Sequence, residues 1–435
     1  MNPRPMRVAM LLLACMMLVD GAGCSSKTYL IATPTVMLGE RGKETFAAVP
    51  ESLRTPEIQI LYAADRDIVK KSILGVEYGS GRSGQLAIGS ATITFDPELS
   101  WDNLVKLSTE AHRPGEPLAL RIKSATEFGR LAIPLQNMEV RDGRYVLPEN
   151  EAAEIDRSRA KFHEVLRDRL AQTPKKDVYV FVHGFNNTFE DAIFRLGMIW
   201  HMAGRPGVPI VYTWPAGYGG LKGYAYDRES GEFTVFHLKL FIEALASCPE
   251  VERIHLIAHS RGTDVLITAL REINIEMRAK NLRTHEQLKL ENLVLAAPDM
   301  DDDVFEQRFA IEDLHLAANR TTIYLSQTDI ALAFSRWLFG GGSRLGNLTP
   351  QKLTPDAKKK LSQLKSFYLI NCAVTGFSTS HDYAFAHPAV LSDLILLLRD
   401  DKPPGAENGR PLTSHGAGIW EIHNDYLRQP ASEEK

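Results

Sequence analysis

One stretch of this chain decides the fold class: Ile254-His255-Leu256-Ile257, then Ala258-His259-Ser260-Arg261-Gly262, then Thr263-Asp264-Val265-Leu266-Ile267. An apolar strand followed by small-X-Ser-X-Gly and a helix is the pattern of a nucleophile elbow, a tight turn that lifts a serine hydroxyl away from a sheet. Large side chains two positions before or after Ser260 would clash with neighbouring backbone, so Ala258 and Gly262 are the small residues required. An ordinary strand-to-helix turn that carries a serine is the alternative interpretation.

Apolar strands alternate with helices on both sides of this stretch. The predicted strands are 178–182, 210–214, 253–258, 293–296, 322–325 and 367–370, and the predicted helices are 189–203, 229–247, 261–280 and 387–399. Strands that are apolar on both faces and alternate with helices indicate a mostly parallel sheet covered by helices on both faces. The sequence therefore predicts an α/β fold over residues 149–400, opening with a charged helix at 149–171.

The segments outside this core differ in pattern. Residues 57–148 contain the predicted strands 58–62, 86–88, 91–95, 118–122 and 130–135, and we expect this β-rich region to complete or flank the sheet. Residues 24–56 carry scattered glycines, prolines and polar groups and are predicted to be a tether. Residues 401–435 are predicted to be a C-terminal tail.

The first 23 residues have the pattern of a signal peptide. Arg4 and Arg7 precede an apolar run over 8–19, and Gly21-Ala22-Gly23 then leads to Cys24. This resembles the lipobox of bacterial lipoproteins, with Gly21 where Leu is usual. We expect Cys24 to be lipidated and to anchor the protein to a membrane on the periplasmic side of a bacterial cell envelope; the absence of an acidic residue at 25 and 26 favours the outer membrane. A plain secretory signal or a short uncleaved anchor is the alternative.

Composition limits the class of partner. The chain has 435 residues, of which 44% are hydrophobic and 24% charged, so it is an ordinary globular protein. Its net charge of −4 does not suggest nucleic-acid binding. Cys248 and Cys372 either pair in an oxidising compartment or remain free thiols. The spacing of Cys and His does not suggest a zinc site, and no metal or organic cofactor is implied.

A reactive serine needs a base, and the base needs an orienting acid. In a sheet of this kind both should follow later strands, in the chain order Ser, acid, His. Asp329 fits the acid, a few residues after the strand at 322–325, although it also precedes the helical run 330–338 and is a candidate N-cap. Asp299, just after the strand at 293–296, is the alternative acid.

His381 fits the base, because it lies in a loop after the last predicted strand and before the last helix. His387 is the alternative, but it stands at the start of the closing helix, where a capping role is expected. His259 adjoins the nucleophile, and the turn should point its ring away from Ser260. We therefore assign catalysis to Ser260, Asp329 and His381.

Two backbone amides are predicted to hold the oxyanion. One belongs to Arg261, at the N-terminus of the helix after the elbow, where the helix dipole favours negative charge. The other belongs to Phe185, in a loop where Gly184 lets the backbone approach the substrate. Asn186 is expected to orient this loop or bind substrate. We expect His183 and Trp214 to line the pocket, although aromatic packing beneath a loop is the alternative for the segment 214–220; the glycine-rich segment 340–346 is a candidate rim or lid.

Several motifs occur together in an order known from one family. They are Leu61-Tyr62-Ala63-Ala64-Asp65-Arg66, His183-Gly184-Phe185-Asn186, Tyr212-Thr213-Trp214-Pro215, Ala258-His259-Ser260-Arg261-Gly262, Ala297-Pro298-Asp299-Met300-Asp301 and Thr328-Asp329-Ile330-Ala331-Leu332. This resembles the bacterial α/β-hydrolase family of unknown function, of the esterase/lipase superfamily, over about residues 57–399. The resemblance implies Ser260 as nucleophile, Asp329 as acid and His381 as base. Arg261 stands where many members have Met, which keeps the amide donor and favours an anionic or polar substrate.

The predicted function is hydrolysis of a carboxylic ester or related acyl bond, in a small-molecule ester or lipid, through an acyl-enzyme. A second hypothesis is a catalytically silent envelope lipoprotein that binds a lipid or a protein partner in the same pocket.

Overall fold

The computed structural model describes residues 27–73, 75–113, 115–326, 329, 355–375 and 381–428. These residues form a sheet of eleven strands in the order β12-β13-β11-β10-β9-β8-β6-β7-β1-β2-β3. The strands are β1 (Ile58–Ser72), β2 (Gly75–Asp96), β3 (Ala119–Ala132), β6 (Asp177–Val182), β7 (Val208–Thr213), β8 (Arg253–His259), β9 (Leu290–Ala296), β10 (Arg320–Leu325), β11 (Phe367–Cys372), β12 (Thr413–Gly416) and β13 (Ile419–Ile422). Parallel pairing links the neighbouring strands β13, β11, β10, β9, β8, β6, β7 and β1. At one edge β2 pairs antiparallel with β1 and with β3, and at the other edge β12 pairs antiparallel with β13. The predicted mostly parallel α/β fold is confirmed.

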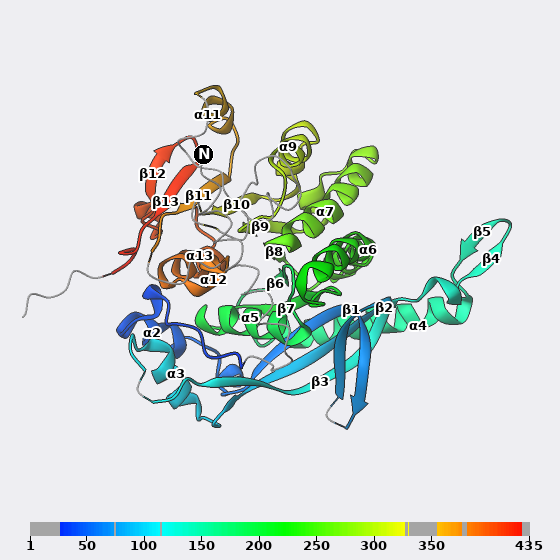
Figure 1. Cartoon of the computed structure of the whole chain (residues 1–435), viewed down its shortest axis with the longest axis horizontal. Coiled ribbons are helices and arrows are strands. Elements are labelled where there is room, and N and C mark those ends of the chain that lie inside the picture. Colours follow the sequence, from blue (N-terminus) through cyan, green and yellow to red (C-terminus); the bar gives the residue numbers. More distant parts are fainter. Residues whose placement is uncertain are drawn as a thin grey trace, which may run out of the picture.

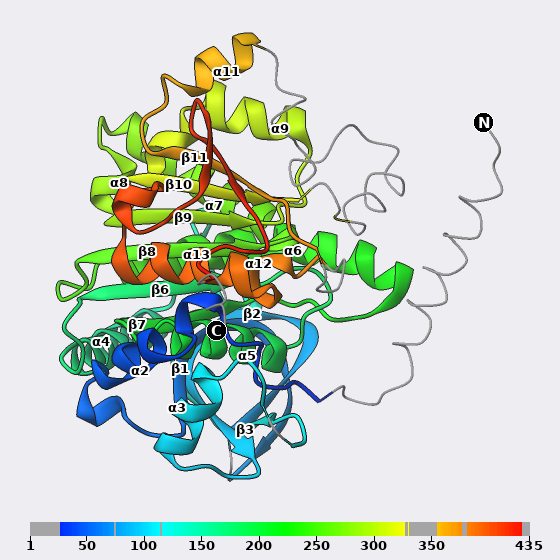
Figure 2. The same cartoon turned by 90° about the vertical axis from the view of Figure 1, so that its left-hand side faces the viewer.

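Helices cover both faces of the sheet, as the apolar strands require (Figure 1). The main helices are α2 (Glu40–Ala47), α3 (Trp101–Thr109), α4 (Glu149–Leu170), α5 (Phe189–Met202), α6 (Gly220–Ala246), α7 (Arg261–Ala279), α8 (Thr284–Gln287), α9 (Asp302–Glu306), α11 (Pro355–Leu361), α12 (Tyr383–Ala386) and α13 (Pro388–Asp400). In β6, alternate residues serve two cores: Val180 packs with α4, α6 and α7, and Phe181 packs with α5 and α13. Figure 2 shows α12 and α13 lying across the second of these faces.

The N-terminal strands are part of the same sheet, because β1 pairs in parallel with β7 over Leu61–Ala64. The strand segments expected at 86–88 and 91–95 belong to one long strand, β2, which pairs with both β1 and β3. The prediction of a tether over 24–56 is wrong for the described part from residue 27. Met37, Phe46 and Val49 are buried there against α13 and α3, because short apolar runs between the prolines and glycines supply a packing surface.

The prediction of a C-terminal tail over 401–435 is also wrong for the described residues up to 428. The strand β13 pairs with β11, and Ile419 and Ile422 are buried. Arg410 forms a fully buried ion pair with Asp393 of α13, with 2.8 Å between Nη2 and Oδ2. The pattern missed this because the strands are only four residues long and the anchoring contact joins distant parts of the chain.

Some predictions lie outside the described residues: the signal peptide, the lipidation of Cys24, the helical run 330–338 and the glycine-rich segment 340–346. Within the described residues, no helix combines the length and the apolar character needed to cross a membrane. Cys248 and Cys372 are free buried thiols, and they belong to the cores on opposite faces of the sheet.

Candidate active site

Ser260 occupies a strained turn between β8 and α7. Its backbone has φ 51° and ψ −124°, in the region that side chains other than glycine rarely adopt. A Cβ atom on Gly262 would lie 2.2 Å from the carbonyl oxygen of His183 and 2.7 Å from that of Val182, so position 262 admits only glycine without a shift. Ala258 is completely buried. The turn thus has the geometry of a nucleophile elbow.

The side chains of Ser260, His381 and Asp329 meet at one edge of the sheet. Oγ of Ser260 lies 2.5 Å from Nε2 of His381, and Nδ1 of His381 lies 2.7 Å from Oδ2 of Asp329. Each residue follows a different parallel strand, β8, β11 and β10 respectively. Because the carboxyl ends of neighbouring parallel strands share one edge, residues up to 121 positions apart come together.

The charges around His381 make it a stronger base. Burial would lower the pKa of His381, but the hydrogen bond and charge of Asp329, with the charges of Asp299 and Asp382, raise this pKa above its ordinary value. An ionised carboxylate accepts only, so Asp329 requires the proton on Nδ1. Nε2 is then left with its lone pair toward the hydroxyl of Ser260.

The alternative residues take other positions. Asp299 is buried, and its backbone amide donates to the carbonyl oxygen of Ser260 at 3.3 Å, whereas Asp329 is the carboxylate at Nδ1 of His381. His387 is the N-cap of α13, where Nδ1 accepts from the amide of Ala389.

His259 supports the loop that carries His381. Its Nε2 donates to the carbonyl oxygen of His381 at 3.2 Å, and burial, with the charge of His381, lowers the pKa of His259 to about 4. Its ring also packs against the ring of His381, with 5.0 Å between the centroids.

The loop after β6 approaches the elbow closely. A Cβ atom on Gly184 would lie 2.8 Å from Cβ of Ser260, so glycine is required for this approach. The amide of Phe185 comes next in this loop, and the amide of Arg261 begins α7. Asn186 has φ 55°, and its amide donates to Oδ2 of Asp227 at 2.9 Å. Asn186 therefore orients the loop through its backbone.

The guanidinium of Arg261 is paired along its own helix. Its Nη2 lies 3.0 Å from Oδ2 of Asp264, which also pairs with Arg308. The carboxylate of Asp264 offsets part of the positive charge that the sequence predicts beside the pocket.

His183 and Trp214 are completely buried, so the prediction that their side chains line a pocket is wrong. Their rings stack with 5.1 Å between centroids, and Nε1 of Trp214 donates to the carbonyl oxygen of His183. They pack beneath the loop that carries Gly184 and Phe185, which is the alternative the sequence allowed for the aromatic residues.

Four charged residues that support the site were not predicted: Arg66, Asp227, Arg195 and Asp382. Arg195 of α5 pairs with Asp382 at 2.6 Å and so holds the residue next to His381. Burial would raise the pKa of Asp382, but the charge and hydrogen bond of Arg195, with the two neighbouring histidines, lower it. Arg66 ends the sequence motif Leu61–Arg66 and lies within β1, so a local signal was available for it. Arg195 and Asp227 carry no local signal, because each acts on a distant segment.

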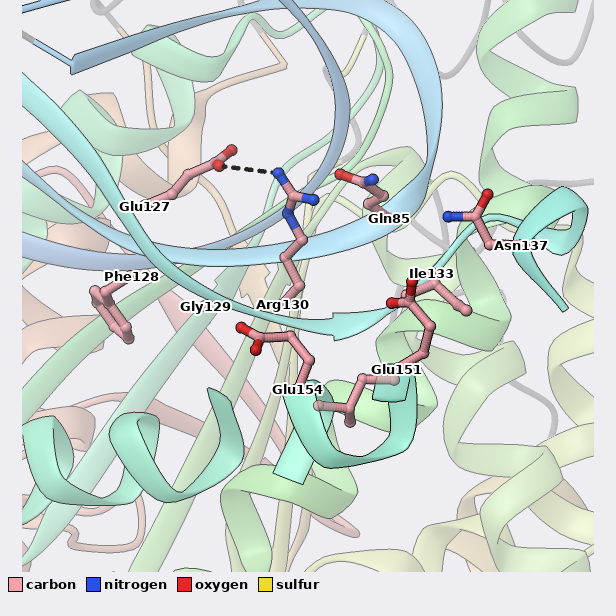
Figure 3. A pocket seen from close by; sticks show the side chains of 10 residues that line it. Gln85, Glu127, Phe128, Gly129, Arg130, Ile133, Asn137, Glu151 and Glu154 are labelled. Atoms are coloured by element: carbon pink, nitrogen blue, oxygen red, sulfur yellow. Dashed lines mark ion pairs between the residues drawn. The ribbon is translucent and has the colours of Figure 1, made fainter. Parts of the chain in front are cut away.

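A separate cavity of about 420 Å³ lies between β3 and α4 (Figure 3). Its lining includes the ion pair between Glu127 and Arg130, and none of its ten residues is a serine, cysteine or histidine. Five strand spacings separate β3 from β8, which is roughly 24 Å. This cavity is therefore distinct from the site at Ser260.

Comparison with known proteins agrees with the fold. A family model described as alpha/beta hydrolase of unknown function (DUF900) matches residues 158–399, more than half of the chain, including Ser260, Asp329 and His381. A search of curated proteins found no match. The chain belongs to this family of alpha/beta hydrolases of unknown function.

Proposed function

We propose that this α/β hydrolase is a serine hydrolase that cleaves a carboxylic ester or a related acyl bond through an acyl-enzyme. One observation carries the proposal. Oγ of Ser260, on its strained turn, is within hydrogen-bond distance of Nε2 of His381, and Nδ1 of His381 is hydrogen-bonded to Asp329. A nucleophile, a base and an orienting acid in this arrangement supply what acyl transfer requires.

In the first half-reaction, Oγ of Ser260 attacks the acyl carbon while Nε2 of His381 takes its proton. The amides of Phe185 and Arg261 stabilise the oxyanion, and the charge of Asp329 stabilises the imidazolium. When the tetrahedral intermediate collapses, His381 gives the proton to the departing alkoxide, and the alcohol leaves. Water then attacks the acyl carbon of the acyl-enzyme while Nε2 of His381 takes its proton. The bond between the acyl carbon and Oγ of Ser260 breaks, His381 returns the proton to Oγ, and the carboxylic acid is released.

A fluorophosphonate probe tests the proposal, because it labels only an activated serine. The wild type should be labelled, and Ser260→Ala should not, whereas Ser247→Ala, an exposed serine at the end of α6, should label like the wild type. On a p-nitrophenyl ester, Ser260→Ala should lower kcat on the order of 10⁴- to 10⁶-fold. Absence of labelling in folded wild type would favour a binding protein that uses the same pocket. A panel of esters, thioesters and amides then identifies the bond.

We further propose that the protein is lipid-anchored in a bacterial cell envelope through Cys24. The support is the sequence alone: two basic residues, an apolar run and small residues directly before Cys24. Metabolic labelling with an alkyne fatty acid should mark the full-length protein and should not mark Cys24→Ala. Equal labelling of both would overturn the anchor.

A further inference from the structure

Arg66 is a buried cation that joins the loop after β6, which packs on Ser260 at Gly184, to the loop after β7. It lies near the middle of β1, outside residues 158–399, and is only 2% exposed. Its guanidinium donates to Oγ1 of Thr213 (2.7 Å), to the carbonyl oxygens of Asn187 (2.7 Å), Ala216 (2.8 Å) and Gly79 (3.1 Å), and to Nε2 of His183 (3.1 Å). Burial lowers the pKa of Arg66 to about 10, so the guanidinium is still protonated at neutral pH.

The guanidinium determines which nitrogen of His183 carries the proton. Arginine has only donors, so Nε2 of His183 must accept, and the amide of Trp214 donates to the same Nε2 at 3.0 Å. Burial, with the charge of Arg66, holds the pKa of His183 well below its ordinary value, so the ring stays neutral. Its one proton is therefore on Nδ1, which donates to the carbonyl oxygen of Gly184 at 2.9 Å.

That last bond sets the direction of the next amide. The peptide unit between Gly184 and Phe185 is planar and trans, so its N–H points opposite to its C=O. The C=O of Gly184 is directed at the buried ring of His183, and the N–H of Phe185 is consequently directed away from it. Gly184 packs directly on Ser260, because a methyl group added to this glycine would lie 2.8 Å from Cβ of the serine. The oriented peptide thus lies next to the nucleophile.

We infer that Arg66 and His183 are positioning residues that orient the Phe185 amide as an oxyanion donor. This inference rests on the proposed acyl transfer at Ser260. Asp227 of α6 supports the same arrangement from the other side, because Oδ2 accepts from the amides of both Asn186 (2.9 Å) and Gly217 (3.3 Å). The two loops are therefore held by a buried cation and a buried carboxylate.

The test uses Arg66→Lys and His183→Phe, the latter of which keeps a ring against Trp214. The chain offers a matched control: Arg205 and His201 are also buried and also hydrogen-bonded, at 3.2 Å. This control pair lies at the far end of α5, a helix of 14 residues and so about 20 Å long. Arg205→Lys and His201→Phe therefore make the same chemical changes away from the nucleophile.

The readout compares an anionic adduct with a neutral complex. A trifluoromethyl ketone adds to the serine as an oxyanion, so its Kd, measured by titration calorimetry, depends on the oxyanion donors, whereas the KM of a p-nitrophenyl ester depends mainly on ground-state binding. In Arg66→Lys and His183→Phe we expect Kd to rise about tenfold or more beyond any rise in KM, and kcat to fall by about 10- to 100-fold. Both control variants should leave kcat and the ratio of Kd to KM unchanged. If one site variant does not fold, the other decides.

Two results would overturn the inference, and they are distinguishable. If the wild type hydrolyses the ester but folded Arg66→Lys and His183→Phe keep the wild-type ratio of Kd to KM, or change it no more than the controls, only the positioning role is wrong. If folded wild type neither hydrolyses an ester nor reacts with a fluorophosphonate, the proposed function fails, and the inference fails with it.

Discussion

Replacing Asp329 by Asn is the most direct test of the residues around His381. The side chain of Asp329 is completely buried, and Oδ2 accepts from Nδ1 of His381 at 2.7 Å. An asparagine of the same shape can present its NH₂ group to Nδ1, and the proton of His381 then moves to Nε2. In that tautomer the imidazole can no longer accept the proton of Ser260.

We expect kcat on a p-nitrophenyl ester to fall by about 10⁴-fold, the cost of the wrong histidine tautomer. At 1.36 kcal/mol for each factor of ten, this corresponds to about 5 kcal/mol of transition-state stabilisation. The matched control is Asp299→Asn, because Asp299 acts on His381 through its charge, whereas Asp329 is bonded to Nδ1. We expect the control to lose no more than about tenfold.

The pH profile gives an independent check. Catalysis needs Nε2 unprotonated, so kcat/KM rises as the pH rises through the pKa of His381. Burial lowers this pKa, and Asp329, Asp299 and Asp382 raise it. Without the charge of Asp329, the rise should occur at lower pH than in the wild type, and the shift should be smaller in Asp299→Asn.

Both variants should be compared with the wild type by thermal unfolding, so that a loss of folding is not read as a loss of catalysis. The assignment of Asp329 is refuted if folded Asp299→Asn loses as much activity as Asp329→Asn. It is equally refuted if the rise in kcat/KM of Asp329→Asn moves to higher pH.

Three other changes have expected outcomes. Gly262→Ala places a Cβ atom 2.2 Å from the carbonyl oxygen of His183, just after β6. It should therefore destabilise the fold by about 1–3 kcal/mol in urea unfolding and lower kcat, and wild-type behaviour in both would contradict the packing argument. Arg195→Met removes the ion-pair partner of Asp382 and should lower kcat on an ester about tenfold, whereas Arg195→Lys should retain most of the activity. Equal losses in the two variants would contradict a role for the positive charge at residue 195. Arg410→Met leaves Asp393 buried without its ion-pair partner, so it should lower the free energy of unfolding in urea by about 3–5 kcal/mol. Adding Asp393→Asn should recover part of this loss. A loss below about 1 kcal/mol would contradict an anchoring role.

Much of the fold and the candidate site could be predicted from local patterns. The elbow at Ser260 is a short-range feature, because strand, small residues and helix are all specified within a few positions. The placement of Asp329 and His381 just after later strands followed from the rule that parallel strands end at the same edge of a sheet, and the chain order Ser, acid, His followed from the elbow pattern. Local patterns also marked the loop of Gly184 and Phe185, because it directly follows a buried strand.

Only the tertiary structure decided the parts that depend on contacts between distant segments. The short strands β12 and β13 and the segment from residue 27 looked like a tail and a tether, because their burial comes from partners elsewhere in the chain. Arg66 shows the same limit: its sequence neighbours mark a strand, but its partners His183 and Asn187 lie in a loop more than 100 residues away. Periodicity reports which face of an element is apolar, whereas the partner of a buried charge is set by how those elements pack.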